Sequence, residues 1–280
     1  MGTKPIGLTI AGSDSGGGAG IQADIKSMEA NGVFATSVLT ALTAQNTREV
    51  RAVFEVPTDF IAAQIDTVFD DFAVGVVKTG MLSSSSIIDV VAGRLVARAS
   101  GVPLVVDPVM ISKGGYPLLA ASAVDALIAR LLPLADVVTP NAHEATALTG
   151  VSVVDESSAR EAARILVDRG PRAALVKGGH VNAGDEVLDV LFDGSDFSVF
   201  RAARIDTQNT HGTGCTTASA IAANLAKGHD LVEAISRTRR YISGAIAGAL
   251  SIGGGHGPTD HFYAFKGSGW FPMDDGSAGS

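Results

Sequence analysis

The sequence predicts an α/β fold whose central sheet is mostly parallel and covered by helices on both faces. Apolar runs typical of buried strands alternate with helical patterns along the chain, which is the order that such a sheet requires. Hydrophobic residues make up 46% of the 280 residues, enough to bury a substantial core. Only 5% of the residues are aromatic and 33 are glycine, a composition that suits close packing of helices on a sheet.

Residue patterns place the expected elements in order along the chain. Apolar runs predict strands at 6–11, 34–42, 74–78, 102–106, 136–138 and 173–176. Helical spacing of apolar residues predicts helices at 22–31, 57–71, 83–99, 121–132, 144–148 and 156–169. Two further runs, 187–192 and 197–202, flank Asp193-Gly194-Ser195 and predict a hairpin. Two long helices, from Thr213 and from Leu231, are expected to close the fold.

The same patterns indicate one domain over residues 1–266. No Pro/Ser-rich linker, run of like charge or internal repeat divides this part of the chain. The segment 267–280 is rich in Gly and Ser, and we expect it to be a flexible C-terminal tail.

Composition also restricts partners and location. The formal net charge of −8 disfavours nucleic acid and anionic membranes as partners. A single cysteine excludes a disulfide framework. The first residues lack the basic and long apolar segments of a secretory signal, and the apolar stretches are too short to span a membrane. We therefore expect a cytoplasmic protein.

The most informative segment is Asn209-Thr210-His211-Gly212-Thr213-Gly214-Cys215-Thr216-Thr217, which leads into an alanine-rich helix. The first amides of a helix lack partners and its dipole is positive there, so this segment favours an anion site. Only glycine is expected to tolerate the backbone shape at Gly214. The helix N-terminus is expected to lower the pKa of the Cys215 thiol. An ordinary N-cap is the alternative interpretation.

Two polar segments follow expected strands, where ligands bind in such sheets. The loop at 12–20 contains a loose G-x-G-x-x-A pattern, but it is too long for a dinucleotide-binding turn. We interpret it as a flexible wall against a small ligand, with Asp24 one turn into the next helix. Gln45 carries an amide that can both donate to and accept from a heteroaromatic ring. Solvated turns are the alternative for both segments.

Oxygen ligands and a lysine follow later strands. Asp107 ends an apolar run, and Asn141 and Glu144 lie three residues apart at a helix start. Such oxygens suit Mg²⁺, although a capping box formed by Asn141 and Glu144 is the alternative. Lys177 precedes two glycines and favours a phosphate contact, with a salt bridge as the alternative. The remaining histidines have no ligand spacing and are assigned no function.

Taken in series, these segments resemble the hydroxymethylpyrimidine/phosphomethylpyrimidine kinase family of thiamine biosynthesis, in the ribokinase-like superfamily. The matching segments are 9–14, 17–24, 42–47, 78–82, 107–110, 139–141 with 144–145, 177–180, 209–216 and 255–258. The resemblance implies a ribokinase-like three-layer αβα sandwich that assembles as a homodimer. It also implies two ATP- and Mg²⁺-dependent transfers, first to the hydroxymethyl group of 4-amino-5-hydroxymethyl-2-methylpyrimidine and then to the resulting monophosphate.

The resemblance further implies a role for each site residue. Gln45 binds the pyrimidine, and Gly12, Asp24, Met81 and Val109 line its pocket. The anion hole for the transferred phosphoryl group consists of Gly212, Thr213, Gly214 and Cys215. Thr210, Asn141 and Lys177 hold ATP, while Glu144 and Asp107 organise Mg²⁺. Most sugar kinases of the superfamily have an aspartate base where Cys215 stands, so the thiolate is expected to be the base.

Two other functions compete with this one. A pyridoxal kinase of vitamin B6 salvage shares the fold and the pocket position, and Gln45 favours the pyrimidine over it. A non-catalytic pyrimidine- or nucleotide-binding protein is disfavoured, because the anion segment, the carboxylates and the lysine are all present.

Overall fold

The computed structural model describes residues 4–111, 115–116, 118–179 and 184–266, so the expected tail at 267–280 lies outside the described residues. Its strands are β1 (Ile6–Asp14), β2 (Phe34–Gln45), β3 (Val50–Glu55), β4 (Val76–Thr79), β5 (Leu104–Val106), β6 (Val137–Val138), β7 (Ala174–Val176), β8 (Glu186–Phe192) and β9 (Phe197–Ala203). They form one sheet in the order β3-β2-β1-β4-β5-β6-β7-β8-β9. Pairing is parallel from β2 to β7, and β3, β8 and β9 join antiparallel.

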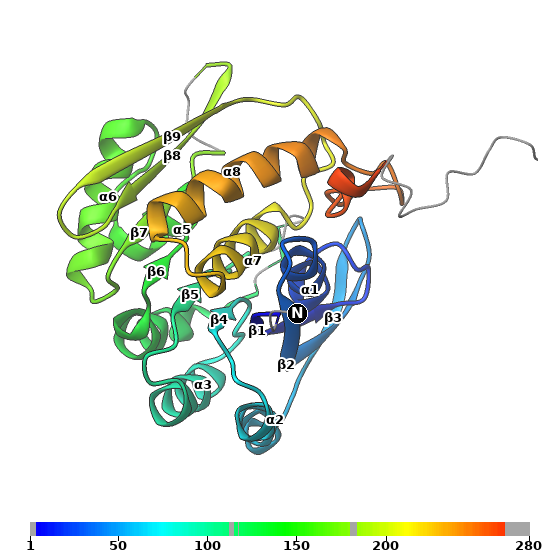
Figure 1. The fold of residues 1–280 in the computed structure, drawn as a ribbon, viewed down its shortest axis with the longest axis vertical. Coiled ribbons are helices and arrows are strands. Elements are labelled where there is room, and N and C mark those ends of the chain that lie inside the picture. The colour runs from blue at the N-terminus through cyan, green and yellow to red at the C-terminus, as the bar shows by residue number, and fades with distance from the viewer. Residues whose placement is uncertain (1–3, 112–114, 117, 180–183, 267–280) are drawn as a thin grey trace, which may run out of the picture.

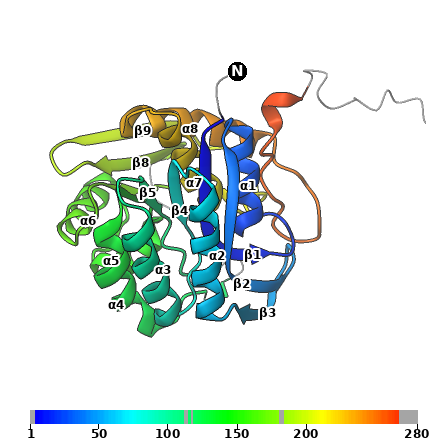
Figure 2. The same cartoon turned by 60° about the horizontal axis from the view of Figure 1, so that its bottom comes forward.

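The helices are α1 (Gly20–Ala30), α2 (Thr58–Asp71), α3 (Ser85–Arg98), α4 (Val124–Ala126), α5 (Ala142–Thr149), α6 (Glu156–Asp168), α7 (Thr213–Ala226) and α8 (Leu231–Ala247). Helices α1, α7 and α8 cover one face of the sheet, and α2, α3, α5 and α6 cover the other (Figures 1 and 2). Each face has its own apolar cluster, the first around Met28, Ile221 and Ile235, the second around Ile61 and Leu166. The predicted three-layer αβα sandwich is therefore confirmed.

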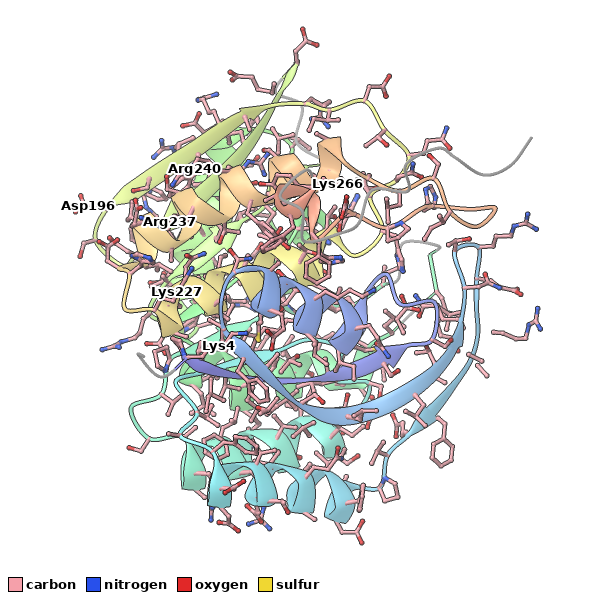
Figure 3. All side chains as sticks on the ribbon, turned by 45° about the vertical axis from the view of Figure 1, so that its right-hand side comes forward. Lys4, Asp196, Lys227, Arg237, Arg240 and Lys266 are labelled. Atoms are coloured by element: carbon pink, nitrogen blue, oxygen red, sulfur yellow. The ribbon has the colours of Figure 1, made fainter. Side chains whose placement is uncertain are left out.

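Helix α8 illustrates how the outer layer separates apolar from charged residues. Ile235 and Ile242 are buried against the rest of the fold. Arg237 and Arg240 of the same helix, labelled in Figure 3, are exposed. An amphipathic pattern of this kind is typical of a helix that covers a sheet.

Two parts of the fold differ from the expectation. Strand β3 was not predicted, because no residue of this edge strand is buried and the sequence therefore lacks the apolar alternation of a half-buried strand. The helix expected at 121–132 is a broken series of turns. It consists of a 3₁₀ turn at Ala121–Ala123, the short α4, a π-helical turn at Leu127–Leu131 and a 3₁₀ turn at Leu132–Leu134 that contains Pro133.

The parallel order of the central strands positions Asp14 and three of the polar residues singled out above. The carboxyl ends of parallel strands meet at one edge of a sheet, and Asp14, Gln45, Asp107 and Lys177 end or directly follow β1, β2, β5 and β7. Lys177 also pairs with Asn141 across the extension of β6. Within the described ranges, no helix has both the length and the apolar character that crossing a bilayer demands.

Candidate active site

A cavity of about 610 Å³ opens at the carboxyl edge of the parallel strands. Of the 14 residues predicted for the site, 13 line it: Gly12, Gln45, Met81, Asp107, Val109, Asn141, Glu144, Lys177, Thr210, Gly212, Thr213, Gly214 and Cys215. They lie at the ends of β1 and β2, after β4, β5, β6 and β7, at the start of α5, and in the segment that runs from Thr210 into α7. The fold thus gathers segments that are far apart in the sequence.

Residues 212–215, where an anion site was expected, lie at the start of α7 and are referred to as the nest. Gly212 is the N-cap and has a left-handed φ of 78°. The amides of Gly214 and Cys215 lie in the first turn, where a helix offers no acceptor for them. A Cβ on Gly212 would lie 1.8 Å from the carbonyl oxygen of Gly18, so a side chain cannot be placed there without moving the loop.

Gly214 does not carry the backbone constraint that was expected of it. It is absent from the described glycines with positive φ, and a Cβ there would meet Lys177 Nζ at 3.5 Å and Asp107 Oδ2 at 3.6 Å, which is ordinary contact. The glycine that conformation requires is Gly212. Gly214 instead lies close to the side chains of Lys177 and Asp107.

Cys215 is half-buried at the cavity wall. Burial raises the pKa of its thiol to about 12, because a thiolate is poorly solvated there. The Lys78 ammonium lowers the pKa, whereas the carboxylates of Asp24 and Asp107 raise it further. The expectation of a lowered pKa is therefore wrong for the site without substrates, since burial outweighs the groups that lower the pKa.

Asp107 and Lys177 form an ion pair opposite the nest. Lys177 Nζ lies 2.9 Å from Asp107 Oδ1, and both side chains are largely buried. The second carboxylate oxygen, Asp107 Oδ2, is buried without a hydrogen-bond partner. An unpartnered buried carboxylate oxygen is costly and is a natural ligand for a cation.

Asn141 and Glu144 form the capping box that the sequence left open as an alternative. The Glu144 amide donates to Asn141 Oδ1 at 2.9 Å, and the Asn141 amide donates to Glu144 Oε2 at 2.8 Å. Burial and the nearby Asp107 carboxylate raise the pKa of Glu144 to about 7, although the charge of Lys177 opposes them. Among the described residues, no group of three or more acidic, His or Cys side chains is arranged to hold a metal ion.

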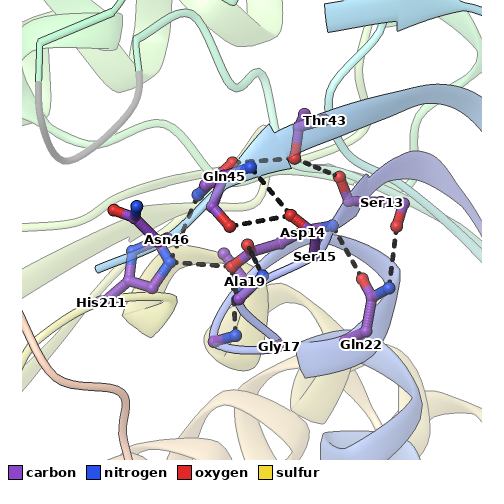
Figure 4. Close-up of polar contacts among 12 residues, drawn as sticks. Ser13, Asp14, Ser15, Gly17, Ala19, Gln22, Thr43, Gln45, Asn46 and His211 are labelled. Atoms are coloured by element: carbon purple, nitrogen blue, oxygen red, sulfur yellow. Dashed lines mark hydrogen bonds and ion pairs between the residues drawn. The ribbon is translucent and has the colours of Figure 1, made fainter. Parts of the chain in front are cut away.

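Gln45 also lines the cavity and is held by its neighbours. Thr43 Oγ1 donates to Gln45 Oε1 at 3.2 Å, and Gln45 Nε2 lies 3.4 Å from His211 Nε2 (Figure 4). Met81 packs so closely on Gly12 that a Cβ there would lie 2.8 Å from Met81 Cε. An amide thus faces the cavity beside an apolar wall.

Asp14 and His211 belong to the site but were not predicted. The Asp14 carboxylate accepts from the amides of Gly16, Gly18 and Ala19 and contacts His211 Nε2 at 2.9 Å (Figure 4). Burial raises the pKa of Asp14, but His211 and the backbone donors outweigh it and hold the pKa below its usual value. The signal in the sequence was an aspartate two residues before Gly16, the pattern of an Asx-type turn.

Asp24 is the one predicted site residue that the fold keeps away from the cavity. Its side chain is fully buried, and its oxygens contact Lys78 Nζ at 2.8 Å and the hydroxyls of Thr9 and Ser219. The expectation that Asp24 lines the pocket is corrected: its position on α1 turns the carboxylate toward the interior, beneath α7.

Known proteins match most of the length of this chain. The family model described as phosphomethylpyrimidine kinase matches residues 14–260. A hydroxymethylpyrimidine/phosphomethylpyrimidine kinase of Streptomyces coelicolor is 52% identical over 262 residues, 94% of this chain and 96% of that protein. A thiamine biosynthesis bifunctional protein of Geobacter sulfurreducens is 55% identical over 257 residues, 92% of this chain. The chain spans 52% of that longer relative.

A solved structure extends the likeness to the fold. Pyridoxal kinase from Staphylococcus aureus, in complex with AMP-PCP and pyridoxal, has a TM-score of 0.86 at 32% identity. The match covers 94% of this chain and 95% of that chain. The chain therefore belongs to the phosphomethylpyrimidine kinase family, whose members are kinases with the ribokinase-like fold.

Proposed function

We propose that this kinase uses ATP to phosphorylate 4-amino-5-hydroxymethyl-2-methylpyrimidine, and then converts the monophosphate into the diphosphate, in thiamine biosynthesis. The observation that carries the proposal is that one cavity contains an amide side chain suited to a pyrimidine, Gln45, and an anion nest that includes Cys215. The name of the Streptomyces coelicolor relative supports the same pair of substrates, and the name of the Geobacter sulfurreducens relative supports thiamine biosynthesis.

Gln45 and the cavity walls around it favour a flat heteroaromatic ring in the molecule that receives the phosphoryl group. A pyrimidine with a ring nitrogen next to an amino group presents an acceptor and a donor side by side, and one amide can pair with both. Met81 and Val109 line the same cavity and supply apolar surface for the ring. Gly12 keeps this wall close, since it leaves room for the Met81 side chain.

The nest and the ion pair opposite it favour a phosphoryl group. Phosphoryl transfer depends on positioning and on neutralising negative charge. Backbone amides at Gly214 and Cys215 and the ammonium of Lys177 provide positive potential from two sides. Thr210 and Asn141 line the same cavity and are proposed to hold ATP together with Lys177.

Magnesium fits the carboxylates of this region. Asp107 Oδ2 is a buried acceptor without a donor, and Glu144 lies close enough for its charge to interact with that of Asp107. We assign Asp107 and Glu144 to Mg²⁺, which would neutralise charge on the phosphates when bound. The Glu144 carboxylate then has two functions, since it also caps α5.

Cys215 is proposed to take the proton in the first transfer. The hydroxymethyl oxygen attacks the γ-phosphorus of ATP, the bond from phosphorus to the bridging oxygen breaks, and ADP leaves. The alcohol proton moves to the thiolate of Cys215. In the second transfer the attacking phosphate oxygen is already anionic near neutral pH, so no base is needed.

Pyridoxal phosphorylation is the second candidate, because the Staphylococcus aureus pyridoxal kinase shares the fold closely. Assays of the purified protein with ATP and each of three acceptors decide between them: the hydroxymethylpyrimidine, its monophosphate and pyridoxal. We expect the highest kcat/KM with the pyrimidine and turnover of the monophosphate. A preference for pyridoxal would overturn the proposal, and binding without turnover would indicate a non-catalytic protein. The homodimer stays a prediction, which sedimentation of the same sample tests.

A further inference from the structure

Lys78 and Asp24 form an ion pair in the interior that none of the proposed substrate contacts uses. Both side chains are 0% exposed, and Lys78 Nζ lies 2.8 Å from each oxygen of Asp24. Taking two charges out of water costs several kcal/mol per ion, and apolar residues of similar size often stabilise a fold as well or better. Stability alone is therefore a weak reason for a charged pair at this place.

The pair contacts α7 at Ser219, one helical turn after Cys215. Asp24 Oδ1 also accepts a hydrogen bond from the hydroxyl of Ser219 at 2.7 Å. Ser219 follows Cys215 by four residues on α7, so the two side chains share one face of the helix. A Cβ on Gly80 would lie 2.8 Å from Lys78 Nζ, so the glycine after β4 leaves the space that the ammonium occupies.

We propose that Lys78 is a positioning residue for the transfer reaction, whose ammonium, held in place by Asp24, stabilises negative charge on the sulfur of Cys215. The inference rests on the proposed function of Cys215 as the base. The Lys78 ammonium then supplies the charge stabilisation that a half-buried thiolate needs.

Four charged groups from four segments act on the Cys215 sulfur. Lys78 on β4 and Lys177 after β7 are cationic, and Asp24 on α1 and Asp107 after β5 are anionic. Lys177 is already bound by Asp107. Lys78 has the largest charge effect on the thiol and opposes the burial that raises its pKa. The pair as a whole therefore favours the thiolate, since Asp24 acts less strongly in the opposite direction.

Alkylation of the cysteine tests this without substrates. Cys215 is the only cysteine among the 280 residues, so the rate of carbamidomethylation by iodoacetamide, followed by intact mass, reports this sulfur alone. We expect Lys78→Met to slow alkylation at pH 8 by roughly three- to thirtyfold, because the thiolate fraction falls while the remaining thiolate is somewhat more nucleophilic. The matched control, Ser219→Ala, removes a hydrogen bond to Asp24 but no charge, and should stay within about twofold.

A double variant separates charge from structure. Lys78→Met leaves the Asp24 carboxylate unpaired and can impair folding, whereas Lys78→Met/Asp24→Asn removes both charges and restores neutrality. A purely structural pair predicts that the double variant regains the rate of the unchanged protein, and that result would overturn the inference. We expect alkylation to stay at least roughly threefold slower. Slow alkylation with an unchanged first transfer would instead contradict the function of Cys215 as the base.

Discussion

The imidazole Nε2 of His211 lies 2.9 Å from Oδ2 of Asp14, and this contact joins the two walls of the cavity. Asp14 organises the glycine loop through the amides of Gly16, Gly18 and Ala19. His211 directly precedes the N-cap of α7 and also reaches Gln45. Gln45, for which we propose pyrimidine binding, is thereby connected to the start of α7.

Asp14→Asn should raise the KM for the pyrimidine by roughly tenfold, since charge-assisted hydrogen bonds contribute about 1.5–3 kcal/mol and an amide cannot accept all four donors. Steady-state kinetics with the pyrimidine as the varied substrate measure this. Asp193→Asn is the matched control, because Asp193 also accepts two backbone amides but lies in the exposed turn between β8 and β9. Similar KM values for the two variants would exclude a specific function of the Asp14–His211 contact.

Gly212→Ala should lower kcat for both transfers by about 10²-fold or more, the cost of losing an oxyanion-type donor. The added Cβ would collide with the Gly18 carbonyl and displace the nest. Gly150→Ala is the control, since Gly150 has a comparable φ of 82° but nothing within 4 Å of its Cβ position. Gly214→Ala should fold normally and keep more activity than Gly212→Ala. Higher activity in Gly212→Ala than in Gly214→Ala would contradict the assignment of Gly212 as the glycine that the nest requires.

Glu144→Gln should raise the magnesium concentration needed for half-maximal rate, because the substitution removes a charge that we assign to the cation. Glutamine can still accept the Asn141 amide, so the cap of α5 is largely preserved. Ser158→Ala provides the comparison, as it breaks the equivalent capping box of α6 on the surface. Magnesium titrations that overlay for all three proteins would assign Glu144 to capping alone.

The pH dependence of the protein's stability should also reflect the ionisation of Glu144. Its pKa rises from an ordinary 4.5 to about 7 on folding, so between these values the unfolded chain loses the proton first. The free energy of unfolding therefore falls as pH rises from 4.5 to 7, and the loss is complete above pH 7. As the pH rises across this window, the free energy of unfolding of Glu144→Gln should gain up to about 3 kcal/mol relative to that of the unchanged chain. Urea unfolding at pH 4.5 and 8 without magnesium tests it, and Glu156→Gln should show no such gain.

Much of the fold could be predicted because buried elements carry periodic patterns. The runs around β1, β4 and β7 are almost wholly buried, and these apolar runs appear directly in the sequence. Strand β3 could not be found this way, since it pairs through its backbone and buries none of its side chains. The irregular turns at 121–134 could not be predicted for a different reason. Apolar spacing alone does not distinguish a regular helix from π and 3₁₀ turns.

The site could be predicted where residues follow strand ends, and not where packing decides. Gln45, Asp107 and Lys177 reach the cavity because of their place at the sheet edge. The direction of the Asp24 side chain depends on how α1 packs beneath α7, which a sequence pattern does not contain. The pKa of Cys215 likewise depends on burial, and local helix geometry alone gave the wrong sign.

The most direct test of the account compares both transfers in Cys215→Ala. The substitution removes the thiol but keeps the backbone amide of the nest. The first transfer should slow by about 10²–10⁴-fold, the usual contribution of a general base, and the second should lose much less. In the unchanged protein the first transfer should rise with pH between about 7 and 9.5, because the thiol pKa is raised, and this rise should vanish in the variant. Equal losses in the two transfers, or a pH dependence that survives the substitution, would contradict Cys215 as the base.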